Sequence, residues 1–415
     1  MQKVRPPYEV VVSELDLSMH PEPETAAQAE ILAEVHRPFS LASGPWLRAA
    51  VVRLSPERRR LVLSLPHVVY DAWSMDIFYR ELSTIYAGLV RGVPDQLPEP
   101  EFQYADATLW LLAEHDAQHL RDLLYWRPQL AGLGDRPLFA SRTGLVRRGL
   151  RQVTRLRTVP LFASGPLAAL RRRAEAVVRR SLSWRSGHGS DRVYSSRRRA
   201  DVSADVVNAL RGIAKAERVS LFAVMSAALE LVLTHRTRDP DVVFATFTAG
   251  RTRPEFNDVM GPIGNTLVIR THLGGGQSFR ALVRRVHQQI VEAQDHGALP
   301  FPTLSAELAR AGELPLEHRI PIVFQLIESL RRGPELYGAQ VGEPRPVSQH
   351  RSSRLGLTAV ANGASITMIL MFDPSLYSDG AAMALLRDLQ CVIKRVSRAP
   401  DASVNDLVAT LDRVQ

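Results

Sequence analysis

The spacing of apolar residues changes repeatedly along this chain and alternates between two patterns. Short apolar runs such as 241–247 have the length and the flanking polar turns of strands. Longer stretches repeat their apolar residues at helical spacing, as in the stripe formed by Phe78, Leu82, Ile85 and Leu89. Strands that alternate with helices in this way predict a layered α/β fold.

The same two patterns predict individual elements. We expect strands at 46–54, 61–65, 241–247, 266–271, 320–327 and 366–372. We expect helices around the 78–89 stripe and at 104–130, 203–218, 221–234, 278–293 and 379–396. The first two strands are joined by a polar turn and should form a hairpin. The helix at 221–234 is almost wholly apolar and should therefore be buried.

Length and composition limit the class of protein. A chain of 415 residues predicts two or three domains, and 45% hydrophobic with 23% charged residues is ordinary globular usage. A single cysteine, Cys391, excludes a disulfide framework and a cysteine-rich zinc site. No apolar run reaches the roughly 18 residues of a membrane span, and the first residues lack the apolar core of a secretory signal. We therefore expect a cytoplasmic protein without a membrane partner.

The net charge of +9 belongs to one segment. Residues 141–200 hold 16 arginines against two acids, Glu175 and Asp191, whereas the rest of the chain holds 36 basic and 41 acidic residues. This composition predicts an atypical arginine-rich linker or insertion between an N-terminal unit, 1–140, and a C-terminal unit, 201–415. Its arginines are not interleaved with aromatic residues, so a nucleic-acid partner is not expected.

One candidate for chemistry remains after the common motifs are searched. The sequence has no phosphate-binding loop, nucleotide-binding glycine motif, nucleophile elbow or HExxH, and its histidines show no metal-ligand cluster. His67 and Asp71 form an HxxxD pattern, which alone is weak because His235 and Asp239 form a second one. His67, however, stands between a predicted buried strand and a helix, where a rigid backbone can hold a side chain at a cleft.

The two residues suit different roles. The imidazole of His67 can accept a proton or orient a nucleophile near neutral pH, although a buried structural histidine would fit the same local pattern. Asp71 is better suited to a buried ion pair that fixes the loop, because an unpaired buried carboxylate is costly. The sequence therefore predicts a cationic partner for Asp71.

The stretch LPHVVYDAWSMDIFYRELSTIYAG around His67 resembles the HHxxxDGWS motif of condensation domains from nonribosomal peptide synthetases. Further resemblances follow in the family's order along 40–140 and 200–396. They are FSLASGPWLRAAVVRL (39–54), YADATLW (104–110), YWRPQLAG (125–132), AGRTRPEFNDVMGPIGNTLVIR (249–270), HGALPFPTL (296–304) and RIPIVFQLI (319–327). Several such segments in the right order make the resemblance specific.

The resemblance implies two subdomains of chloramphenicol-acetyltransferase-like fold that form a V with a central tunnel. Members of the family are acyltransferases that join an acyl or peptidyl thioester to an amine, both held on the phosphopantetheine arms of carrier proteins. His67 matches the catalytic motif histidine and Asp71 the motif aspartate, and Arg270 matches the arginine that pairs with that aspartate. No cofactor is expected to bind directly, since the phosphopantetheine belongs to the partner carriers. The family resemblance also implies a monomer.

The chain departs from the family pattern in three respects. Pro66 replaces the first motif histidine and Ala72 the motif glycine, and a Cβ at position 72 would cost about 1 kcal/mol if that position required a positive φ. The family's first strand and helix lie before the matched region, so an incomplete first subdomain is expected. These departures leave a non-catalytic or degenerate module that recruits a partner as one alternative to amide formation. A second alternative is a close variant of the family, a polyketide-associated acyltransferase that forms esters.

Overall fold

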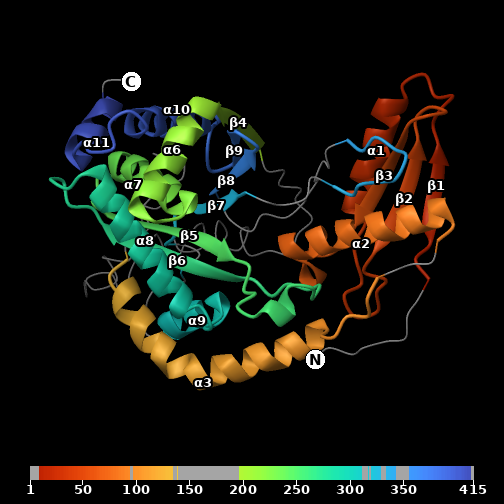
Figure 1. Cartoon of the computed structure of the whole chain (residues 1–415), viewed down its shortest axis with the longest axis horizontal. Helices are drawn as coiled ribbons and strands as arrows, with labels where there is room; N and C mark the ends of the chain where they lie inside the picture. Colours follow the sequence, from red (N-terminus) through yellow and green to blue (C-terminus); the bar gives the residue numbers. More distant parts are fainter. Residues whose placement is uncertain are drawn as a thin grey trace, which may run out of the picture.

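A computed structural model describes residues 9–93, 97–133, 138, 196–310, 316, 319–328, 333–342 and 355–412. The described residues form two lobes, each built around its own β-sheet, and a long helix links them (Figure 1). The predicted α/β class is therefore confirmed. None of the described helices combines the length and the apolar character that a membrane span requires.

The small lobe comprises the first three strands and two helices (Figure 1). They are β1 (Val12–Asp16), α1 (Pro23–His36), β2 (Arg48–Arg53), β3 (Arg59–Ser64) and α2 (Ala72–Arg91). β1 pairs in parallel with β2, and β2 pairs antiparallel with β3, which confirms the predicted hairpin. Ala27 of α1 packs with Val52 and Leu54 in the core of this lobe. β1 and α1 were not among the predicted elements.

The large lobe holds a six-stranded sheet in the order β4-β9-β8-β7-β5-β6. Its strands are β4 (Ser196–Val202), β5 (Asp241–Thr248), β6 (Asn265–His272), β7 (Val323–Ile327), β8 (Leu355–Asn362) and β9 (Ser365–Phe372). Its helices are α6 (Ala204–Glu217), α7 (Leu221–Thr237), α8 (Phe279–Asp295), α9 (Phe301–Arg310), α10 (Asp379–Val396) and α11 (Val404–Asp412). As predicted, α7 is buried along nearly its whole length, between the sheet and the helices α6, α8, α10 and α11.

Helix α3 (Tyr104–Leu130) has the bounds that the sequence predicts, and it runs along the large lobe from the loop between β5 and β6 (Figure 1). Its first half packs Ala107 against Phe256 and Ile263 in the loop between β5 and β6. Its second half buries Trp126 and Leu130 in the main core of the large lobe. A second link is the segment 333–342, in which the backbone N–H of Glu335 donates to the hydroxyl of Ser83 on α2 (2.8 Å).

The predicted arginine-rich segment needs one correction. Residues 196–200 belong to β4, an edge strand that pairs with β9 from Ser196↔Phe372 to Val202↔Ile366. Arg197 and Arg199 are exposed on this strand, as is common for charged residues on sheet edges. Composition alone therefore misassigned the start of a strand to a linker. The rest of that segment, 141–195, lies outside the described residues.

Candidate functional site

His67 begins a single 3₁₀ turn, η1 (His67–Val69), that connects β3 to α2. Pro66 precedes the turn with an extended backbone, and its carbonyl accepts a hydrogen bond from the N–H of Val69 (3.1 Å). The side chain of His67 is exposed. Tyr70 follows the turn with an extended backbone, and its ring stacks on the imidazole of His67, with centroids 4.9 Å apart and planes inclined by 23°.

Asp71 caps the N-terminus of α2. Its Oδ1 accepts hydrogen bonds from the backbone N–H and the hydroxyl of Ser74, both at 2.7 Å, while the Ser74 hydroxyl accepts from the Asp71 N–H (3.2 Å). This reciprocal pair is a capping box. Ala72 is the first residue of the helix and is not among the residues with positive φ. The replacement of the motif glycine therefore costs no left-handed strain.

The cationic partner of Asp71 is Arg251, which follows β5 in the large lobe. Its Nη1 donates to Oδ2 of Asp71 at 2.8 Å and its Nη2 to Oδ1 at 3.3 Å. The same guanidinium donates to the carbonyls of Val259 (3.0 Å) and Ala249 (3.1 Å), and only 2% of the Arg251 side chain is exposed. Burial alone would raise the pKa of Asp71, but the hydrogen bonds from Arg251 and Ser74 outweigh it and hold that pKa below the ordinary value.

Three further contacts fasten the first turns of α2 to the loop 249–264. The hydroxyl of Ser74 accepts from the N–H of Gly261 (2.9 Å), the indole N–H of Trp73 donates to the carbonyl of Asn257 (2.8 Å), and Arg80 pairs with Asp258 (2.7 Å). We call this contact between residues 71–80 and 249–264 the lobe junction. It fixes the backbone that follows His67 to the large lobe.

Glycine is required where the loop approaches α3. Gly261 has φ +153°, and a Cβ there would lie 2.1 Å from Cδ2 of Tyr104, the first residue of α3. Gly250 has φ +65°, and its Cβ would lie 2.4 Å from the carbonyl oxygen of Ile263. These close contacts explain the glycines of the segment AGRTRPEFNDVMGPIGN and hold the loop against both α2 and α3.

A comparison with protein families decides what this arrangement belongs to. The family model described as Condensation domain matches residues 1–154 and 185–415. The chain belongs to the condensation-domain family. Condensation domains are acyltransferase-type enzymes. The residues matched by the model include the whole lobe junction and His67.

Curated relatives of this condensation domain are parts of much longer proteins. Phosphinothricin tripeptide synthetase PhsB of Streptomyces viridochromogenes is 31% identical over 381 residues, which cover 91% of this chain and 27% of that protein. Chondramide synthase cmdD of Chondromyces crocatus is 27% identical over 98% of this chain and 9% of its own length. The chain thus spans under a third of the length of these relatives.

Solved structures confirm the fold of the condensation domain. The X-domain from teicoplanin biosynthesis superposes with a TM-score of 0.75 at 17% identity, covering 98% of this chain and 82% of that one. The first condensation domain of the calcium-dependent antibiotic synthetase gives 0.70 at 20% identity, over 96% of this chain and 78% of that one. At these identities the likeness establishes the fold alone.

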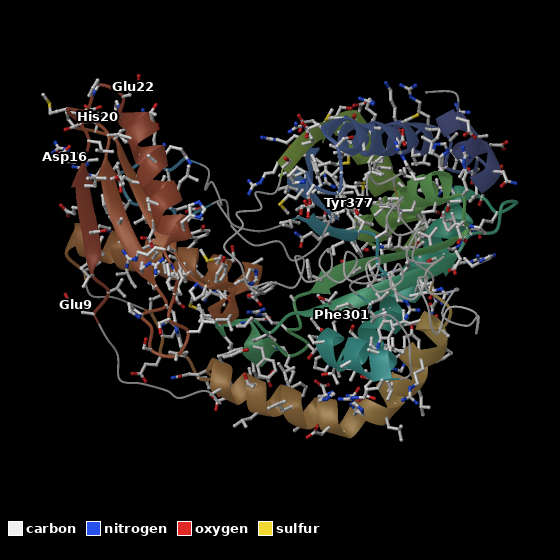
Figure 2. The ribbon with its side chains drawn as sticks, turned by 180° about the vertical axis from the view of Figure 1, so that it is seen from behind. Glu9, Asp16, His20, Glu22, Phe301 and Tyr377 are labelled. Atoms are coloured by element: carbon white, nitrogen blue, oxygen red, sulfur yellow. The ribbon has the colours of Figure 1, made fainter. Side chains whose placement is uncertain are left out.

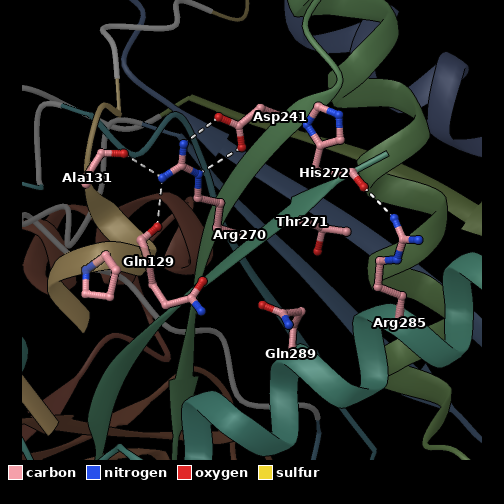
Figure 3. A pocket seen from close by; sticks show the side chains of 9 residues that line it. Gln129, Ala131, Asp241, Arg270, Thr271, His272, Arg285 and Gln289 are labelled. Carbon is pink, nitrogen blue, oxygen red and sulfur yellow. Dashed lines mark hydrogen bonds and ion pairs between the residues drawn. The ribbon is translucent and has the colours of Figure 1, made fainter. Parts of the chain in front are cut away.

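The predicted pairing of Asp71 with Arg270 is wrong. Arg270 binds Asp241 instead, with Nε–Oδ1 and Nη2–Oδ2 distances of 2.8 and 2.6 Å, and its Nη1 donates to the carbonyls of Gln129 and Ala131 at the end of α3, both at 2.8 Å (Figure 3). The register explains this choice. Asp241 lies opposite His272, so Arg270 is its diagonal neighbour, at the end of β6 remote from the loop 249–264.

Arg270 therefore has a structural role that the sequence did not indicate. It lines a polar cavity of about 500 Å³, together with Thr271, Arg285 and Gln289 (Figure 3). Its hydrogen bonds tie the end of α3 to the edge of the large sheet. Neither His67 nor Asp71 lines this cavity.

The residues that sequence reasoning missed are Arg251, Ser74, Trp73 and Tyr70. Arg251 carried a usable signal, because it lies in the short loop that begins after a predicted buried strand, where a side chain can be held rigidly. Ser74 stands three residues after Asp71, which is the spacing of a capping box. Among the described residues, no group of three histidine, cysteine, aspartate or glutamate side chains is placed to hold a metal ion.

Proposed function

We propose that this condensation domain joins a carrier-bound acyl or peptidyl thioester to a carrier-bound amine, forming an amide in nonribosomal peptide or related secondary-metabolite biosynthesis. Family membership and relatives named as peptide synthetases support the proposal. The observation that carries it is the place of His67. Its exposed imidazole stands on a short turn, and Asp71, two residues after that turn, caps α2 and binds Arg251 of the large lobe.

In the proposed reaction the amine nitrogen attacks the thioester carbonyl. The C–N bond forms, the C–S bond breaks, and the sulfur leaves as the thiol of the donor arm while the nitrogen loses a proton. His67 either accepts that proton or orients the amine for attack. Most of the rate enhancement would come from holding two tethered reactants together, which can supply a large effective concentration.

Asp71 and Arg251 would act on this reaction through geometry. Their ion pair lies at the end of the His67 turn and ties it to the loop 249–264. No cofactor would bind to the chain itself, because the phosphopantetheine arms belong to the carrier partners. The small-molecule substrates are the acyl group and the amine that these arms carry.

The test is amide formation between two loaded carrier proteins. His67→Ala should lower turnover by at least about 100-fold, the usual contribution of a general acid–base group, without changing the circular dichroism spectrum. The matched control is His20→Ala, since His20 lies at the outer end of the small lobe (Figure 2) and should be dispensable. Unchanged turnover in His67→Ala would contradict the catalytic role of His67.

The same assay separates the alternatives. An alcohol acceptor that reacts in place of the amine would indicate the ester-forming class. Carrier capture without turnover in the wild type would indicate a recruiting module. A cytoplasmic location, a monomeric state, a tunnel between the lobes, and unit boundaries near 140 and 200 stay predictions.

A further inference from the structure

Among the described residues, one aromatic ring stacks on the imidazole of His67. None of the described residues hydrogen-bonds to either of its ring nitrogens, so no described carboxylate or carbonyl selects its rotamer. The stacked ring of Tyr70 is the contact that does so, at 4.9 Å between centroids. An exposed histidine without such a contact would sample several staggered χ1 wells.

Tyr70 itself is well placed to act as a fixed surface. It is only partly exposed, its backbone is extended, and the next residue is Asp71, whose N–H and carboxylate are bonded to Ser74. Burial raises the pKa of the Tyr70 phenol, so the ring stays neutral around neutral pH. A neutral ring can stack on imidazole and also on imidazolium, to which its face is attractive.

From this geometry we propose that Tyr70 is a positioning residue, which holds the imidazole of His67 in the orientation that the reaction needs. The inference rests on the proposed function of His67. The lobe junction fixes Asp71, Asp71 fixes the backbone of Tyr70, and the Tyr70 ring fixes the imidazole. The ring, and not the hydroxyl, carries the effect.

Two substitutions separate the ring from the hydroxyl. Tyr70→Phe keeps the stacking surface and should keep kcat and KM within about twofold of the wild type. Tyr70→Leu removes the ring and should lower kcat by about tenfold with KM little changed, because misplacing a reacting group costs rate more than binding. The matched control is Tyr86→Leu, which removes another partly buried tyrosine further along α2.

An NMR measurement reports the stacking without any turnover. The imidazole Cε1–H resonance of His67, assigned by its loss in His67→Ala, should be shifted upfield by the aromatic ring at position 70 in the wild type, in Tyr70→Phe and in Tyr86→Leu. In Tyr70→Leu the upfield shift should disappear. The upfield shift of the wild type can be measured with His67→Ala as the only variant. The proposal therefore stays testable even if Tyr70→Leu folds poorly.

The outcomes are decisive in both directions. Loss of the upfield shift together with a lower kcat in Tyr70→Leu, both restored by phenylalanine, supports the proposal. A wild-type resonance without an upfield shift overturns it, as does a Tyr70→Leu variant that loses the shift and keeps its kcat. If the wild type forms no amide or His67→Ala stays active, the proposed function fails instead, and the resonance alone decides whether Tyr70 holds the ring.

Discussion

Replacing Arg251 by methionine tests the lobe junction most directly. The substitution keeps the apolar stem and removes the guanidinium, leaving the Asp71 carboxylate without its cation and the carbonyls of Val259 and Ala249 without donors. Loss of one partner from a buried ion pair costs about 3–5 kcal/mol. Because 17% of the Asp71 side chain is exposed, we expect the lower end, about 3 kcal/mol.

The assay is urea unfolding of the full chain, followed by a double-mutant cycle. Asp71→Asn, Arg251→Met and the double variant should give a coupling of about 1–3 kcal/mol, as residues in direct contact do. Arg270→Met is the matched control, because Arg270 pairs with Asp241 and makes no contact with Asp71. The free energies of Asp71→Asn and Arg270→Met should therefore be additive.

The pH dependence of the same pair has a defined sign. The folded-state pKa of Asp71 lies below its ordinary value of 3.8, so the ion pair contributes its full stabilisation above that value. As the pH falls through the lower folded pKa, that contribution disappears. The stability difference between wild type and Arg251→Met should accordingly shrink in strong acid. The reasoning is refuted if Arg251→Met costs under about 1 kcal/mol at neutral pH, or if Asp71 couples to Arg270 in place of Arg251.

Three substitutions probe other parts of the fold. Burial raises the pKa of Glu230 from 4.5 to about 8. Stability should therefore fall by about 1.4 kcal/mol per pH unit as the pH rises between these values, and Glu230→Met should abolish this fall in urea unfolding. An unchanged slope in the variant contradicts the assignment. Gly261→Ala should cost about 1–3 kcal/mol, since its Cβ would overlap Tyr104, and an unchanged melting temperature would show that the ring yields freely. Asp122→Asn should cost about 1–2 kcal/mol of stability by weakening the 2.9 Å contact with His296. Calorimetry should show a lower melting temperature, and an unchanged one would show that this pair is dispensable.

The elements that the sequence predicted well are those whose own residues dictate their structure. α7 is almost wholly apolar, so its local pattern suffices. α3 also has the predicted bounds, but its leucines are not all core residues, because Leu109, Leu112 and Leu120 are exposed. β4 reads SRRRADV, and nothing in that polar composition distinguishes a strand from a linker. Its structure depends on pairing with β9, a strand more than 160 positions further along the chain. Long-range pairing of this kind is not visible in a local pattern.

The partner of Asp71 was missed for a related reason. Arg251 lies in the loop between β5 and β6, whereas Arg270 lies near the far end of β6, and both suit a carboxylate equally well in chemical terms. Which of them meets α2 depends on which end of the strand pair faces the small lobe. The antiparallel register decides this, because it places Arg270 beside Asp241 at the opposite end from the loop. A sequence identifies the residue types of an ion pair more readily than the ends of the strands that bring them together.

The spacing between His67 and Asp71 follows from the turn that separates them. One 3₁₀ turn begins at His67 and the helix N-cap is Asp71, so the intervening residues are just enough to close the turn and begin the helix. The carboxylate is then used twice, once to cap α2 and once to bind Arg251 in the other lobe. With this spacing the ring of Tyr70, which precedes Asp71, stacks on the imidazole. The HxxxD spacing therefore places an exposed imidazole close to the Asp71–Arg251 ion pair without any contact between the side chains of His67 and Asp71.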